Sequence, residues 1–491
     1  LNPKTTDLAD TTLVGFVPMA LLGKSYLDAF AFQPRPWAEV KRGYSHFRDG
    51  DVLLAKITPC FENGKAGLAR GLPNGVGAGS TEYFVCRPQS GVIESRYLLA
   101  FLKTSDFANE GATRMTGSVG HKRVPKEYLS ERVLPLPPLK EQTRIADQLD
   151  TLLARIQACN DRLDAIPALL KRFRQSVLTA AMCGSLTAEW RDTEARHDRL
   201  PAFIEGDLGD ATQSGSPVSV PSSWRIVLAR NAVQPEAGIV YGIVQPGPKL
   251  ADGIRYVQIT DIVNGRIQIQ SLSHTSEEIA NSYQRSSIRK GDVLLGIIRA
   301  LKVAVVPDEL EGSNISRSVA RLRPREGVSP KFLAYALQSP AVQEWLRSQH
   351  RGMDMPVLNL SEVRLAPIPI APTDEQAEIV RRVDALFMLA DHIEARHAAA
   401  VAQVRRLTPL TLAKAFRGEL VQQDPNDEPA SVLLQRISSA PITAAKAPRG
   451  RPRTQRASKP TTLPALQLDG AALPAGAWAA NGPPDEHATA A

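Results

Sequence analysis

One pattern of apolar and polar residues occurs twice along the chain. In the first copy, apolar residues recur at alternating steps of four and three over 145–177, which places them on one stripe of a helix. The second copy repeats these steps over 379–411, with smaller and more polar residues in the stripe. The copies align without a gap at an offset of 234 residues, as Glu141 and Glu375 illustrate. The pattern predicts two long helices related by an internal duplication.

A helix with one apolar stripe needs a partner, and each copy is the obvious partner of the other. We therefore predict a paired coiled coil of about 60 Å, at ~1.5 Å per residue. Helices of an ordinary bundle inside one large domain are the alternative. Pro167 and Pro409 lie inside the helices at non-equivalent places, where a kink or break is expected. The residues expected to pair the helices are Ile145, Leu149, Leu152, Ile156, Leu163, Leu170, Ile379, Val383, Leu386, Ile393, Val404 and Leu407.

Short apolar segments bounded by glycine, proline and acidic residues precede each helix and are typical of strands. Segment 49–57 is one of them, and a short helix is expected at 97–107. The region before the second helix repeats these landmarks less closely, since 290–298 corresponds to 49–57. Asn264-Gly265 predicts a hairpin turn there. The whole pattern predicts an α+β fold with two α/β domains, each followed by a long helix.

The C-terminal tail is rich in Ala, Pro, Gly and Arg and cannot bury a core, so we expect it to be disordered. Within it, segment 448–456 resembles an AT-hook, in which Arg449 and Arg451 would enter the minor groove of DNA. A plain basic tail is the alternative. The expected segments are a first domain at 1–133 with residues missing upstream, a first long helix at 134–190, a linker at 191–220, a second domain at 221–367, a second long helix with a C-terminal segment at 368–437, and the tail at 438–491.

Composition narrows the function classes. The formal net charge of +8 over 491 residues favours a polyanionic partner. The four cysteines are scattered and form no CxxC pair, so neither a zinc site nor a disulfide framework is expected. No apolar run reaches the length of a membrane span and no signal peptide is present, which favours a cytoplasmic protein without a membrane partner.

No pattern supports a catalytic or metal site. Segment 23–25 resembles the end of a P-loop, but Pro18 stands where the first glycine is required. Asp51 with Lys56, and likewise segment 308–309, lack the third member of a nuclease site. We therefore expect no catalytic residue, and a single-chain enzyme is the disfavoured alternative.

Taken together, the chain resembles the specificity subunit of a type I restriction-modification system. The resemblance extends to about residue 437. It is carried by two divergent domains, each followed by a proline-rich segment, a Glu-Gln pair at 141–142 or 375–376, and an Ala-x-x-Gly-x-Leu end at 181–186 or 415–420. It implies two target recognition domains that each read half of a split DNA target. It also implies that the helices pack antiparallel as a spacer, which sets the number of unread base pairs.

The resemblance further implies partners. These are double-stranded DNA, two DNA methyltransferase (modification) subunits docked on the helices, and nuclease-translocase (restriction) subunits. S-adenosylmethionine, ATP and magnesium would be bound by the partner subunits, and this chain would bind no cofactor. A stand-alone DNA-binding or coiled-coil scaffold protein without a methyltransferase partner is the alternative.

Candidate DNA contacts are polar and basic residues of the two domains. Arginine and asparagine can make bidentate contacts with base edges, whereas lysine more often meets phosphate. The first domain offers Lys56, Thr58, Lys65, Arg70, Arg114, Thr116, Ser118, His121, Lys122 and Arg123. The second offers Arg285, Arg299, Lys302, Asn314, Arg317, Arg347, His350, Arg351 and Asn359.

Overall fold

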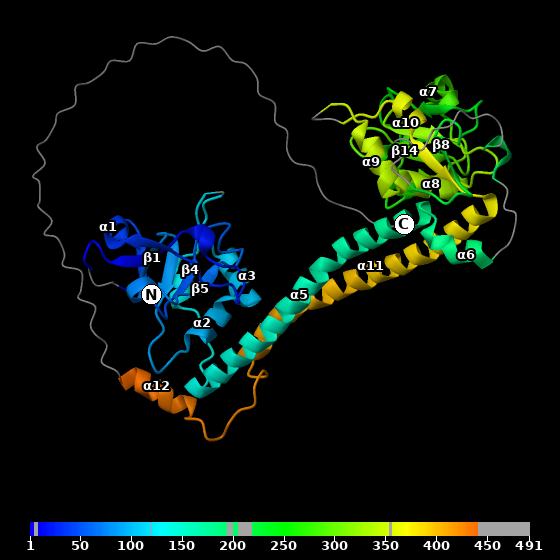
Figure 1. Ribbon diagram of the computed structural model, residues 1–491. Coiled ribbons are helices and arrows are strands. Elements are labelled where there is room, and N and C mark those ends of the chain that lie inside the picture. Colours follow the sequence, from blue (N-terminus) through cyan, green and yellow to red (C-terminus); the bar gives the residue numbers. More distant parts are fainter. Residues whose placement is uncertain (4–7, 119, 194–199, 205–218, 353–355, 440–491) are drawn as a thin grey trace, which may run out of the picture. The chain divides into compact units, whose positions relative to one another are not determined.

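Two helices of 44 residues each dominate the protein, α5 (Leu139–Met182) and α11 (Thr373–Phe416). At ~1.5 Å per residue, each is about 66 Å long. The computed structural model describes residues 1–3, 8–118, 120–193, 200–204, 219–352 and 356–439 (Figure 1).

Both long helices run through an internal proline. Pro167 lies inside α5 and Pro409 inside α11, and neither interrupts its helix. The expectation of a break is therefore wrong. A proline removes one N–H from the helical ladder, and the packing of the rest of each helix holds the flanking turns together.

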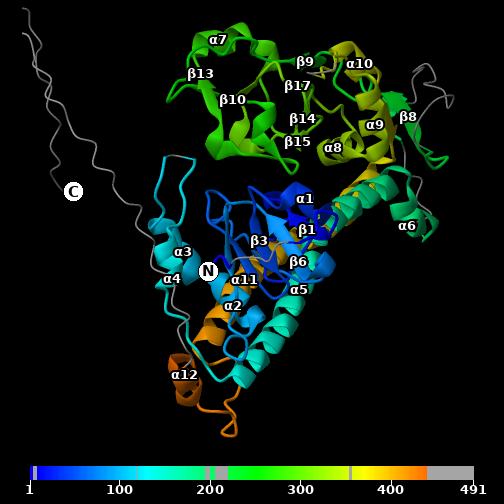
Figure 2. The ribbon, with the colours of Figure 1, turned by 90° about the vertical axis from the view of Figure 1, so that its left-hand side faces the viewer.

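α5 and α11 lie side by side and run in opposite directions (Figures 1 and 2). Leu149, early in α5, packs in one cluster with Leu412, late in α11. Arg174, late in α5, pairs with Asp391, in the first half of α11, at 2.6 Å. The expected antiparallel helix pair is therefore confirmed.

The first globular domain precedes α5. It contains two small sheets, with strand orders β2-β1-β6-β3 and β5-β4-β7. Short helices cover the second sheet and lead towards α5. The elements are β1 (Leu13–Val17), β2 (Gln33–Pro36), α1 (Trp37–Val40), β3 (Ser45–Arg48), β4 (Val52–Ala55), β5 (Ala66–Leu68), β6 (Val76–Gly79), β7 (Tyr83–Cys86), α2 (Ser95–Leu102), α3 (Ser105–Thr113) and α4 (Lys126–Ser130).

The second globular domain lies between α5 and α11 in the sequence. Its larger sheets have the orders β15-β14-β17-β9 and β13-β10-β16, and β18-β8 and β11-β12 form two-stranded ribbons. The elements are β8 (Arg225–Leu228), β9 (Ile239–Tyr241), β10 (Ile254–Val257), β11 (Ile262–Val263), β12 (Arg266–Ile267), β13 (Ser273–Thr275), α7 (Glu277–Ser282), β14 (Val293–Gly296), β15 (Val303–Val305), β16 (Asn314–Ile315), β17 (Val319–Leu322), α8 (Pro330–Gln338), α9 (Pro340–Ser348), α10 (Leu360–Leu365) and β18 (Pro367–Ile370).

The two domains share their strand pairing although their sequences have diverged. β1 pairs antiparallel with β2 and parallel with β6, and β10 pairs in the same way with β13 and β16. β4 lies between β5 and β7, and β14 lies between β15 and β17, with all of these pairs antiparallel. The expected α+β fold with two mixed domains and a helical spacer is thus confirmed, and the duplication includes the domains.

The Gly-Asp turns before β4 and β14 are structural. Asp51 is 1% exposed and accepts two hydrogen bonds from Arg87, both at 2.7 Å. Asp292 is also 1% exposed and pairs with Arg323 at 2.8 Å. A buried carboxylate needs such a partner, because an unpaired charge is expensive to bury. The predicted turn at Asn264-Gly265 is also present, with φ values of 49° and 75°.

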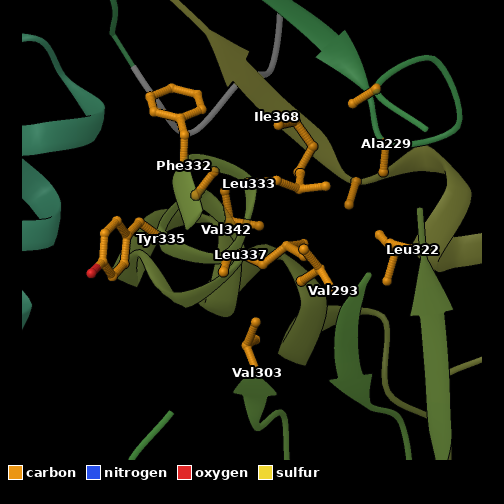
Figure 3. Close-up of a cluster of buried hydrophobic side chains, with 14 of the residues drawn as sticks. Ala229, Val293, Val303, Leu322, Phe332, Leu333, Tyr335, Leu337, Val342 and Ile368 are labelled. Atoms are coloured by element: carbon orange, nitrogen blue, oxygen red, sulfur yellow. The ribbon is translucent and has the colours of Figure 1, made fainter. Parts of the chain in front are cut away.

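The largest core belongs to the second domain and continues into the helix pair. Figure 3 shows Val293 of β14, Val303 of β15 and Leu322 of β17 on the side of α8 that carries Leu337. The same cluster contains residues from the end of α5 and the start of α11. The domain and this end of the spacer therefore share one hydrophobic core.

The described residues of the segment expected as a linker, 191–220, include short helical elements. The segment starts within α6 (Ala188–Thr193) and contains a 3₁₀ turn, Ala202–Ile204, whose Phe203 packs against the core of the second domain. Near the C-terminal end of the described chain, α12 runs from Ala430 to Ser439. The tail from 440 onward, with Arg449 and Arg451, lies outside the described residues.

Replacing Leu153 with alanine tests the packing of α5. Leu153 is 4% exposed and packs with Leu412 and Ala415 of α11, whereas its neighbour Leu152 is half-buried and outside every core cluster. We expect Leu153→Ala to lower the free energy of unfolding by about 2–5 kcal/mol and Leu152→Ala by about 1 kcal/mol or less. Denaturant unfolding of both variants measures the difference. If both variants lost the same free energy of unfolding, Leu152 would contribute as much to the packing of α5 as Leu153, and the observed difference in burial would not explain stability.

Candidate nucleic-acid interface and spacer helices

A hairpin-like arm projects beyond β4 in the first domain. The backbones of Thr116 and Arg123 exchange two hydrogen bonds, at 3.0 and 2.8 Å, which close the arm. The arm is held against the loop after β4, since the N–H of Thr58 bonds the carbonyl of Lys122 at 2.9 Å. Several separate candidate residues are thereby brought onto one loop pair.

The second domain repeats this arm. The backbones of Arg351 and Val357 exchange hydrogen bonds at 3.0 and 2.9 Å. The N–H of Arg299, in the loop after β14, bonds the carbonyl of Pro356 at 2.8 Å. Arg299 has a φ of 68°, a conformation unusual for a residue with a side chain. Residues 353–355 of this arm lie outside the described residues.

Candidates on the first arm are exposed, but not all are free. Arg123 forms a bidentate ion pair with Glu82, with N–O distances of 2.8 to 3.1 Å. This pair holds the pKa of the Glu82 carboxyl below its usual value. The other exposed candidates on the arm are Thr116, Ser118, His121 and Lys122.

The remaining candidates of the first domain are spread more widely. Lys65 donates to the carbonyl of Met19 at 2.6 Å, and Thr58 donates to Glu62 at 2.7 Å. Arg114 pairs with Glu110 at 3.1 Å. The side chain of Lys65 therefore has a structural bond. Lys56 is half-buried over the ring of Phe84, and Arg70 is exposed in the loop after β5.

The candidates of the second domain fall into separate groups. Arg299 and Arg351 are exposed at the arm, and Arg285 and Arg317 are exposed on other loops. Asn359 is exposed at the residue preceding α10. No single surface therefore collects all of them.

Two of the remaining candidates lie beside α5, and a third, His350, directly precedes the arm. Lys302 and Arg347 line a cavity of about 540 Å³, together with Lys171 of α5. His350 is half-buried, and burial lowers the pKa of its imidazole, with nearby Arg347 adding to the effect. A neutral imidazole is a weaker attraction for phosphate than an exposed cation.

Asn314 lies in the core and not on the expected surface. Its side chain is 2% exposed, and its amide oxygen accepts from the hydroxyl of Ser286 at 2.6 Å and from the N–H of Ile315 at 2.8 Å. Its NH₂ group donates to the carbonyls of Ala280 and Tyr283. All of its hydrogen-bonding capacity is used internally, so the side chain offers nothing to a DNA base.

Gln142 joins the first domain to the start of α5. Its side chain is 0% exposed, and its Oε1 accepts from the N–H of Glu94, which caps α2, at 2.9 Å. Its NH₂ group donates to the carbonyls of Val92 and Pro137, both at 2.9 Å. One amide therefore ties the domain, the proline-rich segment and the helix together.

Gln376 repeats these bonds in the second copy. Its Oε1 accepts from the N–H of Ser329, which caps α8, at 2.9 Å. Its NH₂ group donates to the carbonyls of Gly327 and Ala371, at 3.0 and 2.8 Å. The Glu-Gln pairs of the duplication thus mark two equivalent attachment points.

An ion pair adds a second contact at each attachment point. Arg96 of α2 pairs with Asp150 of α5 at 2.7 Å, and Lys331 of α8 pairs with Asp384 of α11 at the same distance. Arg96 also pairs with Asp147 at 2.8 Å. The first attachment therefore has the larger charge network, although partly exposed ion pairs contribute modestly to stability.

Glu375, beside Gln376, binds the segment that follows α5. Its carboxylate is 1% exposed and accepts from the hydroxyl of Thr187 at 2.7 Å, from Arg191, and from the indole N–H of Trp224 at 2.7 Å. The end of one repeat is thereby bonded to the start of the next. Arg191, at the start of the segment expected as a linker, therefore takes part in this contact.

The equivalent carboxyl, Glu141, has a different environment. It is 5% exposed, and burial raises its pKa, with Asp427 adding to the rise and Arg144 opposing it. Arg144 itself pairs with Asp427 at 2.6 Å, which joins the start of α5 to the segment after α11. Both ends of the spacer are thus closed by polar contacts between repeats.

The predicted pairing residues are buried mainly near the helix starts. Ile145, Leu149, Ile379 and Val383 are at most 1% exposed, and Leu170 is 8% exposed. Leu152, Ile156, Leu163, Leu386 and Val404 are half-buried. By contrast, Ile393 and Leu407 are 39% and 42% exposed. The apolar stripe is therefore not a continuous seam, and the middle of the pair is thinly packed.

Sequence reasoning missed several residues that build this site. Gln142, Asp150 and their second copies were recognisable as identical pairs in the duplication, but no pattern indicated a role. Leu153 is the buried residue of its turn, and the strict heptad step selected Leu152 instead. Among the described residues, no group of three or more His, Cys, Asp or Glu is placed to hold a metal ion, and no helix is long and apolar enough to cross a membrane.

Comparisons with known proteins agree on one family. Residues 37–168 and 249–402 match the model of the type I restriction modification DNA specificity domain. The chain is 37% identical to the type I restriction enzyme EcoBI specificity subunit of Escherichia coli over 346 residues, 70% of either chain. It is 28% identical to the EcoKI specificity subunit of the same species over 390 residues, 76% of either chain.

Two solved structures share the fold. One comes from work on complex assembly and conformational transition of the type I restriction-modification system, with a TM-score of 0.58 and 20% identity, covering 84% of this chain and 93% of the other. The second is the HsdS subunit from Thermoanaerobacter tengcongensis, with a TM-score of 0.53 and 20% identity, covering 84% and 92%.

Replacing Gln142 with alanine tests the attachment of the first domain. The change leaves the N–H of Glu94 and the carbonyls of Val92 and Pro137 without their partner. We expect the free energy of unfolding to fall by about 2–4 kcal/mol and the segment before α5 to become sensitive to protease. Gln157→Ala is the matched control, because Gln157 is exposed on the same helix and bonds only Asp161. A loss no larger than that of the control would contradict the attachment.

Proposed function

The chain belongs to the type I restriction-modification DNA specificity family, and we propose that its two domains read the halves of a split target in double-stranded DNA. The spacer helices would set the separation of the halves and dock modification subunits. This division of roles assigns recognition to the present chain and chemistry to its partners.

The repeated attachment of the domains carries this proposal. Gln142 and Gln376 make equivalent bonds at the starts of two helices that run antiparallel. A duplicated unit arranged in this way suits a DNA target with two halves, because half-sites read from one face of the duplex must lie at a separation that the protein fixes. Helices of about 66 Å are long enough to span more than one turn of DNA.

The arms support a role in DNA contact. Each domain presents its arm beside the loop that follows its central strand, and each arm has exposed cations, Lys122 in one and Arg351 in the other. Lysine and arginine at such tips suit phosphate contact, and arginine can also read guanine in the major groove. The same loop pair in both domains suggests equivalent modes of binding.

The spacer surface supports docking of other subunits. Met388, Leu389 and Leu410 of α11 are 64%, 51% and 51% exposed. Met388 and Leu389 are adjacent in α11, and neighbouring exposed apolar groups are typical of surfaces that a partner covers. We propose that two modification subunits bind along the spacer and carry S-adenosylmethionine. Nuclease-translocase subunits, with ATP and magnesium, would complete a restriction complex.

Co-expression with a modification subunit tests the proposed function. We expect a complex with one copy of this chain and two of the partner, which methylates a two-part target. The purified chain alone is expected to transfer no methyl group from labelled S-adenosylmethionine. Mass measurement of the complex and sequencing of methylated DNA check both points. Methyl transfer by the chain alone, or no change in the partner's target, would overturn the proposal.

A variant of the spacer surface tests the docking site in the same experiment. Met388→Asp/Leu389→Asp is expected to lose the modification subunits while keeping the unfolding midpoint of the parent, because both side chains are already exposed. Retention of a full complex by this variant would place the docking surface elsewhere.

Replacing Lys122 with alanine tests the first arm. We expect weaker binding to all DNA sequences alike, and a salt dependence whose slope falls by about one, as for the loss of one phosphate contact. Lys290→Ala is the control, because Lys290 is also exposed but does not belong to the arm. Its Nζ pairs with the carboxylate of Asp308 at 2.7 Å. Fluorescence anisotropy over a range of salt concentrations measures both. An unchanged slope for Lys122→Ala would argue against contact between the arm and phosphate.

A further inference from the structure

The proline inside α5 leaves one backbone acceptor without its helical partner. In a helix, the carbonyl of each residue accepts from the N–H four residues later. Pro167 has no N–H, so the carbonyl of Leu163 receives no such bond, although α5 continues unbroken through this point. A carbonyl of this kind is available to a donor from outside the helix.

α11 supplies that donor. The Nε2 atom of His397 lies 2.9 Å from the carbonyl oxygen of Leu163. A carbonyl can only accept, so Nε2 carries the hydrogen in this bond. The side chain of His397 is half-buried, which shields the bond in part from water. Proline on one helix and histidine on the other thus make one complementary contact.

This contact lies at the centre of the duplication. Leu163 and His397 are separated by 234 residues, which is the offset between the two copies. They are therefore equivalent residues that meet across the helix pair, at its pseudo-two-fold axis. No residue of 154–169 on α5 or of 391–411 on α11 is fully buried, so apolar packing is weak on both sides of the contact.

Duplicated helices have competing ways to pair. In a pair of two α5 helices from separate chains, Leu163 would face Leu163, and the free carbonyl would have no donor. In a pair of two α11 helices, His397 would face a carbonyl that already accepts from the N–H of Val401. A shift by one heptad would place His397 against carbonyls of α5 that are bonded within the helix. Only the observed pairing satisfies both groups.

We propose that Pro167 and His397 form a lock that selects pairing of α5 with α11 within one chain, in this register. Apolar stripes alone tolerate slippage by a heptad, whereas a single polar partner at the interface selects one alignment. His397 is a positioning residue, because it acts through the carbonyl of Leu163 and not on DNA. Its effect on the spacing of the half-sites rests on the proposed function. A slip of one heptad, about 10 Å, corresponds to roughly three base pairs.

A double-mutant cycle on the purified chain tests the lock. We expect His397→Leu to lower the unfolding midpoint by about 2–4 °C in the parent and to give chains that associate through their helices. Pro167→Ala restores an N–H to the Leu163 carbonyl, so in that background His397→Leu is expected to cause no loss. Calorimetry and sedimentation measure both effects. His392→Leu, at an exposed site of the same helix, is the control. Its effect on the unfolding midpoint should be the same whether residue 167 is proline or alanine.

An equal effect of His397→Leu in both backgrounds would overturn the lock, because the histidine would then act by packing and not through the carbonyl. These measurements need neither DNA nor a partner, so they remain decisive if the proposed function fails. An assembled complex that contains the His397→Leu variant is expected to methylate targets with a broader range of spacings between the half-sites than the parent complex. Unchanged spacing despite coupling in the cycle would overturn the role of the lock in specificity.

Discussion

Two buried glutamine amides connect the globular domains to the spacer helices, and the rest of the structure depends on them. Gln142 and Gln376 each use the carbonyl oxygen and the NH₂ group at once. A buried amide left unpaired is unfavourable, so each set of bonds favours one geometry. A helix can set a separation only if the domain at its end cannot turn freely. The amides supply that restraint where the chain enters each helix.

The chemistry of these bonds also explains how the domains can diverge. On the domain side, Gln142 bonds the backbone of Glu94 and Val92, and Gln376 bonds the backbone of Ser329 and Gly327. Backbone groups are the same whatever side chain they carry. The domain sequence can therefore change for a new DNA target while its attachment to the helix stays intact. The ion pairs beside the amides tolerate more variation, since arginine in one copy corresponds to lysine in the other.

Much of the fold could be predicted from periodicity and duplication, because heptad steps and strand landmarks are local signals. The long helices, the mixed domains and the turn at Asn264-Gly265 follow from such signals. Burial depends on neighbours that are distant in sequence, and there the prediction was weaker. Leu153 is buried where the heptad step selected Leu152, and Asn314 bonds inside the core where a surface role was expected. For the candidate site, sequence identified basic loops but could not show that the arms join them.

Under the proposed function, the middle of the spacer has to meet two demands that apolar packing cannot meet together. A surface that other subunits can cover must leave apolar groups such as Met388 exposed, which removes them from the contact between the helices. Alignment of the helices must nevertheless be unique, and small or exposed residues give little preference for one register. The carbonyl of Leu163, which Pro167 frees, is directional, so its bond with His397 adds alignment without adding apolar area. The two ends of the spacer therefore supply stability, and its centre supplies register.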